Sequence, residues 1–141
     1  MLNNKIMNQV IFMIEIGMKG RSESKVTNER TAKAAGSGTL NVYATPWMIA
    51  LMENAACAAI GEALEEGQSS VGTMMNVSHV SATPVSMKVW AEAEVTGVDR
   101  RKVSFKVSAY DEAGLIGEGV HERFVISEDK FIDKCYSKLE K

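Results

Sequence analysis

VYATPWMIALMENAACAAI, residues 42–60, is the stretch that decides the fold of this chain. Its residues are almost all apolar, and Glu53 is the only charged residue among them. A helix that is apolar nearly all round is expected to be buried. An ionised carboxylate on such a helix is costly unless it has a partner, so Glu53 needs a structural or a chemical explanation.

The same stretch carries its own start signal. Thr45 is a preferred N-cap residue, and Pro46 follows at the first helical position, where the missing N–H costs nothing. Gly67, which comes directly after two glutamates, is a stop signal. We therefore expect one helix from about Pro46 to about Glu65, long enough to cross a small domain.

Composition limits the classes of function. The 141 residues fit one domain, and a net charge of −2 gives no basic field for nucleic acid and no polybasic membrane patch. Two cysteines, Cys57 and Cys135, do not make a disulfide scaffold, so we expect a reduced, cytoplasmic protein. The two histidines, His79 and His121, do not complete a zinc-ligand spacing with them, so no metal site is expected.

The N-terminal residues do not read as a membrane segment. The apolar run of residues 10–14 is interrupted by Glu15, whereas a span needs roughly 20 apolar residues. A signal peptide needs a longer apolar region and a cleavage site of small residues. We expect residues 1–18 to be a partly ordered leader, with Met18 as a second candidate start, and residues 19–141 to form a single domain.

Alternating apolar residues predict an antiparallel sheet after the helix. One face of each of two adjacent runs is apolar, from Met87 to Val95 and from Val103 to Ala109. A further run, 115–126, places Val120, Phe124 and Ile126 on one side. The predicted strands are 19–26, 71–80, 87–95, 103–110 and 115–126, with a polar loop or short helical turn at 27–41 and a short helix after Ser127.

One long apolar helix followed by a meander of strands favours an α+β domain, in which a curved antiparallel sheet of about five strands wraps the helix. Such a sheet has edges to protect, and pairing of two sheets edge to edge in a dimer does so.

Glu53 has two readings from the residues alone. It is a functional carboxylate, or it is a structural one that pairs with Arg123 or Lys88. Cys57 lies one helical turn after it, and a cysteine on an apolar helix usually behaves as a small hydrophobe rather than a nucleophile.

Thr45 and His79 also have plain structural readings. Capping alone explains a threonine before a proline, and a lone histidine is more often a surface or core residue than a catalytic one. His79 ends the strand that follows the helix. It meets Glu53 only if that strand runs back along the helix or a second subunit brings the two together.

Several ordered motifs resemble the hot-dog-fold thioesterases, and within them the fluoroacetyl-CoA thioesterase-like branch. They are VYAT at 42–45, followed eight residues later by Glu53, then VGT at 71–73, VSHVSATP at 77–84 and GEGVHER at 117–123. The likeness covers about residues 19–135.

The resemblance implies an acyl-CoA thioesterase that works without metal or bound cofactor. It implies a homodimer, or a higher oligomer, with active sites near the subunit interface. The family's catalytic residues fall on Thr45, Glu53 and His79. Gly72 matches a glycine whose backbone lies against the substrate carbonyl, and Arg123 matches an arginine near the site.

The sequence also departs from the fluoroacetate-specific pattern. Residues 27–41 contain no aromatic residue, where that pattern has aromatic lid residues, and Pro46-Trp47 replaces a smaller pair. These differences argue against selectivity for fluoroacetyl-CoA and predict a general or unknown acyl-CoA substrate and a more open entrance. The alternative functions are a non-catalytic hot-dog module that binds CoA-like ligands and, with a poorer match of motifs, a hot-dog dehydratase.

Overall fold

The computed structural model describes residues 13–140, so most of the expected leader lies outside the described residues. The elements are the strands β1 (Lys19–Lys25), β2 (Gln68–His79), β3 (Lys88–Asp99), β4 (Lys102–Asp111) and β5 (Gly114–Ser127), the helices α2 (Ala32–Ala35), α3 (Thr45–Ile60) and α4 (Glu128–Tyr136), and the 3-10 turns η1 (Asn28–Arg30), η2 (Gly61–Ala63) and η3 (Ser137–Glu140).

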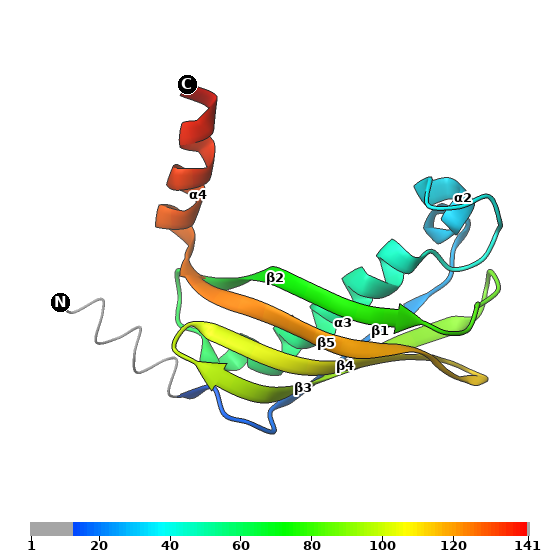
Figure 1. The fold of residues 1–141 in the computed structure, drawn as a ribbon, viewed down its shortest axis with the longest axis horizontal. Coiled ribbons are helices and arrows are strands. Elements are labelled where there is room, and N and C mark those ends of the chain that lie inside the picture. Colours follow the sequence, from blue (N-terminus) through cyan, green and yellow to red (C-terminus); the bar gives the residue numbers. More distant parts are fainter. Residues whose placement is uncertain (1–12, 141) are drawn as a thin grey trace.

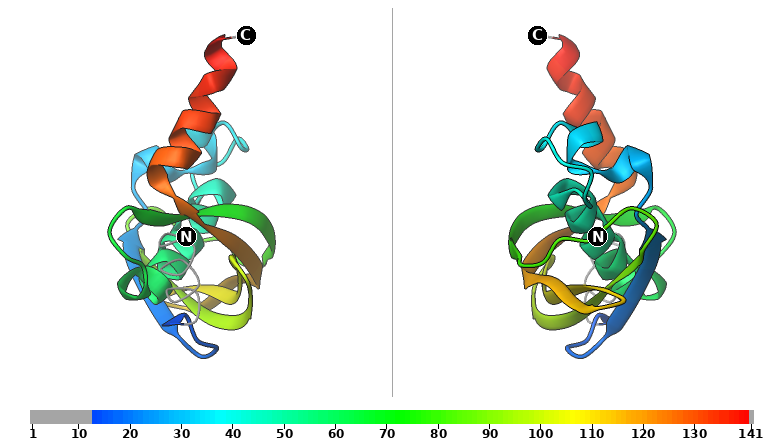
Figure 2. Two further views of the ribbon diagram at one scale, coloured as in Figure 1. Left: turned by 90° about the vertical axis from the view of Figure 1, so that its left-hand side faces the viewer. Right: turned by 90° about the vertical axis from the view of Figure 1, so that its right-hand side faces the viewer.

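The five strands form one antiparallel sheet in the order β1-β3-β4-β5-β2. Viewed end-on, the sheet curls round α3, with β1 and β2 as its two edges (Figures 1 and 2). The α+β architecture expected from the sequence is therefore confirmed. Within the described chain β2 pairs with β5 alone, so its other edge is open.

The inward faces of β3 and β4 are the predicted ones, because Val89, Val95, Val103 and Phe105 are all fully buried against α3. Strand β5 presents the opposite face from the one its large apolar residues suggest. Val120 and Phe124 point outward and are exposed, whereas His121, Arg123 and Val125 are buried. The polar residues of β5 therefore occupy the inside of the wrap.

Helix α3 is shorter and less enclosed than expected. It ends at Ile60, because the chain tightens into η2 before it reaches Gly67. Its buried residues are Met48, Leu51, Met52, Ala55, Ala56 and Ile60. The flank with Ala50, Asn54 and Ala58 is exposed, and 41% of the Glu53 side chain is accessible. The expectation that this apolar helix is buried is thus met only in part by a single chain, because the sheet leaves a gap between its edges.

A close approach of β1 to α3 fixes one side of the wrap. A Cβ at Gly20 would lie 2.2 Å from the carbonyl oxygen of Ala55 and 2.4 Å from the nitrogen of Ala59. Only glycine lets the two backbones come this close. Between the same two elements, the hydroxyl of Ser22 on β1 donates to Oδ1 of Asn54 on α3 at 2.8 Å.

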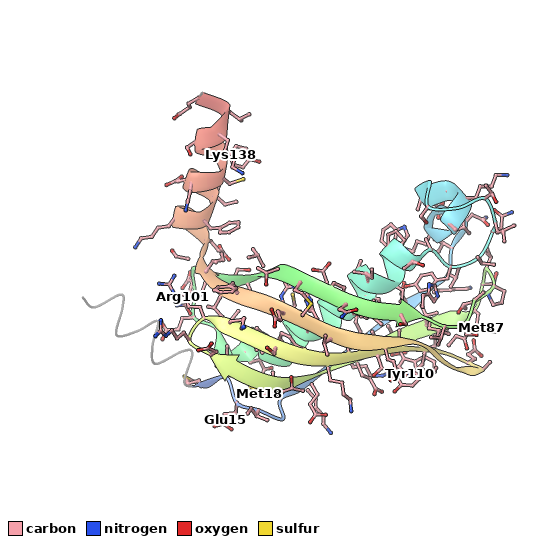
Figure 3. The ribbon with its side chains drawn as sticks, in the orientation of Figure 1. Glu15, Met18, Met87, Arg101, Tyr110 and Lys138 are labelled. Carbon is pink, nitrogen blue, oxygen red and sulfur yellow. The ribbon has the colours of Figure 1, made fainter. Side chains whose placement is uncertain are left out.

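Two segments lie outside the wrapped core. Residues 27–41 form η1 and α2 beside the start of α3, as the predicted loop with helical turns. At the other end, α4 and η3 stand clear of the sheet, as the position of Lys138 shows (Figures 1 and 3). Among residues 13–140, no helix combines the length and the apolar character that a membrane crossing needs.

Candidate active site

The Glu53 carboxylate is held by a buried arginine. Arg123 on β5 donates from Nη1 to Glu53 Oε2 at 3.2 Å, and the two form an ion pair. The Arg123 side chain is 7% exposed. Of the two partners that the sequence left open for Glu53, the structure selects Arg123, because Lys88 pairs with Glu23 at 2.6 Å on the outside of the sheet.

Arg123 is itself anchored from several sides. Its Nε donates to the Ser70 hydroxyl at 2.8 Å, and its Nη2 donates to the Ser70 carbonyl at 3.0 Å. Its Nη1 also lies 3.2 Å from Nε2 of His121, which is 1% exposed. The guanidinium therefore has little rotational freedom, and it holds the Glu53 carboxylate in one orientation.

A β-bulge brings Gly72 to the same place. The register between β2 and β5 shifts between Gly72 and Met74, which inserts Thr73 as an extra residue. Gly72 then faces α3, where a Cβ would lie 2.4 Å from Glu53 Oε2 and 3.3 Å from Arg123 Nη1. No residue larger than glycine fits beside the carboxylate without moving it.

Thr45 and His79 form a second polar pair. Thr45 Oγ1 lies 2.7 Å from His79 Nδ1. The helix N-cap is Ala44, and no side-chain capping bond is made, so the Thr45 hydroxyl is not used as the cap that the sequence predicts. Its hydroxyl is instead engaged with an imidazole, as a nucleophile is with its base.

His79 has an unusual environment. Burial lowers the pKa of its imidazole below the ordinary value of 6.5, which favours the neutral ring at neutral pH. Its Nε2 is buried and has no hydrogen-bond partner within the described chain. A hydrogen bond between the ring and the Ser81 backbone acts in the opposite direction on the pKa but is outweighed by burial.

The two polar groups do not meet within one chain. Strand β2 runs back along α3 and carries His79 to the start of the helix, beside Thr45 and not Glu53. Eight residues of helix separate Thr45 from Glu53, which is about 12 Å along the axis. No hydrogen bond or ion pair of the described residues joins the Thr45–His79 pair to the Glu53–Arg123 pair.

A shallow cavity of about 300 Å³ opens over the Thr45–His79 pair. Small residues dominate its wall, which consists of Ala32, Ser37, Val42, Tyr43, Thr45, His79, Val80, Ser81 and Ala82. Tyr43 is the only aromatic residue there. Burial raises the pKa of its phenol to about 12, and its hydroxyl donates to the Trp47 carbonyl at 3.1 Å.

Metal ligands are not gathered at either pair. Within residues 13–140 no three His, Cys, Asp or Glu side chains come together in a way that would hold a metal ion. The chemistry that the two pairs offer is that of a hydroxyl, an imidazole and a carboxylate.

The fluoroacetyl-CoA-specific thioesterase family matches residues 26–129 of the chain. The chain belongs to this family. The fluoroacetyl-CoA thioesterase of Streptantibioticus cattleyicolor is 43% identical over 97 residues, which is 69% of this chain and 70% of that protein. The likeness to the thioesterase branch that the motifs indicated is thus confirmed.

Solved structures of thioesterases in and around this family share the fold. A structure of the fluoroacetyl-CoA thioesterase superimposes with a TM-score of 0.83 at 35% identity, over 88% of this chain and 96% of that one. A thioesterase superfamily member from Thermus thermophilus gives a TM-score of 0.81 at 31% identity, over 90% and 93% of the two chains. The hot-dog fold expected from the motifs is confirmed.

Two residues of the site were not identified from the sequence. His121 and Ser70 anchor Arg123, yet neither was singled out. The sequence signal that indicates them is the spacing of His121 and Arg123, which puts both on one face of a strand. That strand follows two strands with apolar inner faces. The larger apolar residues on the other face of β5 obscured it.

Proposed function

We propose that the protein hydrolyses an acyl-CoA thioester to a free acid and CoA, with Thr45, His79 and Glu53 as its catalytic residues. The observation that supports this most directly is the 2.7 Å contact of Thr45 Oγ1 with His79 Nδ1. The Thr45 hydroxyl makes this contact and does not cap the helix. It is thereby coupled to a neutral imidazole, which is the arrangement that nucleophilic catalysis needs.

The proposed reaction has two steps. His79 takes the proton of the Thr45 hydroxyl as its oxygen attacks the thioester carbonyl, and the protonated imidazole then gives that proton to the departing CoA thiolate. A water molecule next gives a proton to His79 and attacks the acyl-threonine ester, and the imidazole returns that proton to the Thr45 oxygen as the acid departs. In the dimer proposed below, the backbone N–H of the other copy's Gly72 stabilises the oxyanion that forms in each step.

Glu53 acts on the second step and on the imidazole. Arg123 binds its Oε2, and Oε1 receives no hydrogen bond from the described part of the chain. This oxygen is therefore available to accept a proton from His79 Nε2 or to orient the hydrolytic water.

The site is proposed to form between two copies of the chain. The open edge of β2 and the exposed flank of α3 adjoin, and both suit a second copy. If two β2 strands pair antiparallel about a two-fold axis at Met75, His79 of one copy comes opposite Val71 of the other, next to Gly72. Each Thr45–His79 pair then lies beside the partner's Glu53.

The acyl group is proposed to differ from fluoroacetate. Apart from Tyr43, the wall over Thr45 and His79 is built from alanine, serine and valine, and residues 27–41 bring no aromatic side chain to it. Such a wall excludes little by size, and beside Thr45 and His79 its polar groups are mainly the small hydroxyls of Ser37 and Ser81. The free thiols of Cys57 and Cys135 suit the reduced cytoplasm, which is the proposed location.

The direct test is release of free thiol from a series of acyl-CoA esters of different length and substitution. Wild-type protein should hydrolyse at least one of them, and Glu53→Gln should lower kcat by about 100-fold or more. Tight binding of acyl-CoA without turnover by wild-type protein would instead favour a non-catalytic binding module. Unchanged turnover in Glu53→Gln would refute the role of the carboxylate.

A further inference from the structure

The Arg123 guanidinium divides its hydrogens among three partners. Nε–H and Nη2 go to Ser70, through its hydroxyl and its carbonyl. The two hydrogens of Nη1 are shared between Glu53 Oε2 and His121 Nε2, each at 3.2 Å. A planar guanidinium has a fixed fork of donors. When one Nη1 hydrogen bonds to His121, the other Nη1 hydrogen is therefore held in the direction of Glu53.

The tautomer of His121 follows from its partners. Its Nδ1 lies 2.8 Å from the Met74 carbonyl, which only accepts, so Nδ1 carries the proton. Nε2 is then a lone pair that accepts from Arg123. A doubly protonated ring would oppose an N–H to an N–H and would bring a second positive charge beside the guanidinium.

We propose that His121 is a positioning residue for the thioesterase site, which orients Arg123 and through it the Glu53 carboxylate. The imidazole is 1% exposed and is stacked on Phe105 of β4 with ring centroids 5.8 Å apart, so its lone pair is fixed in space. The chain Met74, His121, Arg123, Glu53 links the bulged edge strand to the helix. The positioning role of His121 in catalysis rests on the function proposed for Glu53. The contact between His121 and Arg123 does not depend on that function.

Charged groups around His121 come from two elements. Arg123 on β5 and Glu53 on α3 lie on its side of the sheet, and Glu122 acts on it through its charge from the outer face of β5, while β4 supplies an apolar ring and β2 a carbonyl. Burial is the largest influence and lowers the pKa of His121 below 6.5, Arg123 lowers it further, and the Met74 carbonyl and the two carboxylates oppose this. The accepting form of the ring is therefore the one present at neutral pH.

Three variants isolate the contact. His121→Phe keeps a ring of similar size and removes both the donor and the acceptor. His121→Gln keeps one amide donor for the Met74 carbonyl and one carbonyl acceptor for Arg123. Val95→Ala is the matched control, because it removes buried volume from β3 without touching the polar cluster.

The kinetic readout is the split between kcat and KM. His121→Phe should lower kcat by about 10- to 100-fold and leave KM within about three-fold, as expected for a misplaced catalytic group. His121→Gln should recover most of kcat, and Val95→Ala should lose thermal stability with kcat unchanged. Loss of kcat in proportion to lost stability across all three variants would overturn the assignment.

The second readout does not depend on activity. The guanidinium ¹⁵N–¹H signals of Arg123 should show hindered rotation in wild-type protein and in His121→Gln, and averaged signals in His121→Phe. Averaging should also set in for wild-type protein, but not for His121→Gln, as the pH falls through the pKa of His121. Unchanged Arg123 signals in His121→Phe would overturn the inference. If wild-type protein released no thiol from any acyl-CoA, the proposed function would fail, and these signals would still decide whether His121 orients Arg123.

Discussion

Mixing two inactive variants should restore activity, because the two polar pairs lie on different parts of the chain. Thr45→Ala removes the hydroxyl beside His79, and Glu53→Gln removes the carboxylate beside Arg123. Within one chain these groups are about 12 Å apart along α3, beyond the reach of a hydrogen bond. If each site takes Thr45 from one copy and Glu53 from the other, a mixed dimer contains one intact site and one doubly damaged site.

The expected magnitude follows from this arithmetic. Random exchange of equal amounts gives half mixed dimers, and one of their two sites is complete, so the mixture should show about a quarter of the wild-type rate. Mixed dimers purified through two different affinity tags should show about half of the wild-type rate per dimer.

The assay is thiol release from the best acyl-CoA of the series, measured before and after subunit exchange. The double variant Thr45→Ala/Glu53→Gln mixed with wild-type chain is the control, because its mixed dimers contain no complete site. A mixture of the single variants that stays inactive, although mass measurement shows that mixed dimers have formed, would refute the shared site. A monomeric mass with full activity would refute it as well.

Three further predictions follow from the glycines and the histidines. Gly72→Ala should lower kcat by about 10-fold or more with little change in melting temperature, because its Cβ meets the movable end of a side chain at 2.4 Å; a wild-type kcat would contradict this. Gly20→Ala should lower the free energy of unfolding by about 2–3 kcal/mol in urea titrations, because its Cβ meets backbone atoms at 2.2 Å. Gly61→Ala is the control and should leave the free energy of unfolding unchanged, because no atom lies within 4 Å of its Cβ. Burial lowers the pKa of His79 and His121 in the folded state, so the unfolded state binds more protons below about pH 6.5. The free energy of unfolding should therefore decrease from pH 6.5 downward and be independent of these groups above it; equal pH dependence in wild-type protein and His121→Gln would contradict the part assigned to His121.

The long helix and the strands could be predicted because their patterns are local. The apolar run of α3 and the alternation from Met87 to Val95 are each set by neighbours within a few residues. The inward face of β5 could not be predicted in the same way. Its apolar residues Val120 and Phe124 face outward, since Arg123 is needed inside to pair with the carboxylate of α3. That requirement arises from a contact 70 residues apart in the sequence.

The candidate site was predictable as a set of residues but not as an arrangement. Motif likeness indicated Thr45, Glu53 and His79 together, and the residues alone named Arg123 as one of two partners for Glu53. Which pairs form depends on how far β2 runs back along α3, and no local pattern encodes that length. His121 was missed because a neutral buried histidine resembles any other strand residue until its two partners are seen.

The extra residue at Thr73 gives β2 two phases. Before it the even-numbered residues Ser70 and Gly72 face the helix, and after it the odd-numbered residues Met75, Val77 and His79 do so. Point substitutions cannot convert one phase into the other; only a change in chain length does. The inserted residue of this chain therefore decides which residues of β2 face the helix, and its deletion would turn the opposite set of side chains inward over one half of the strand.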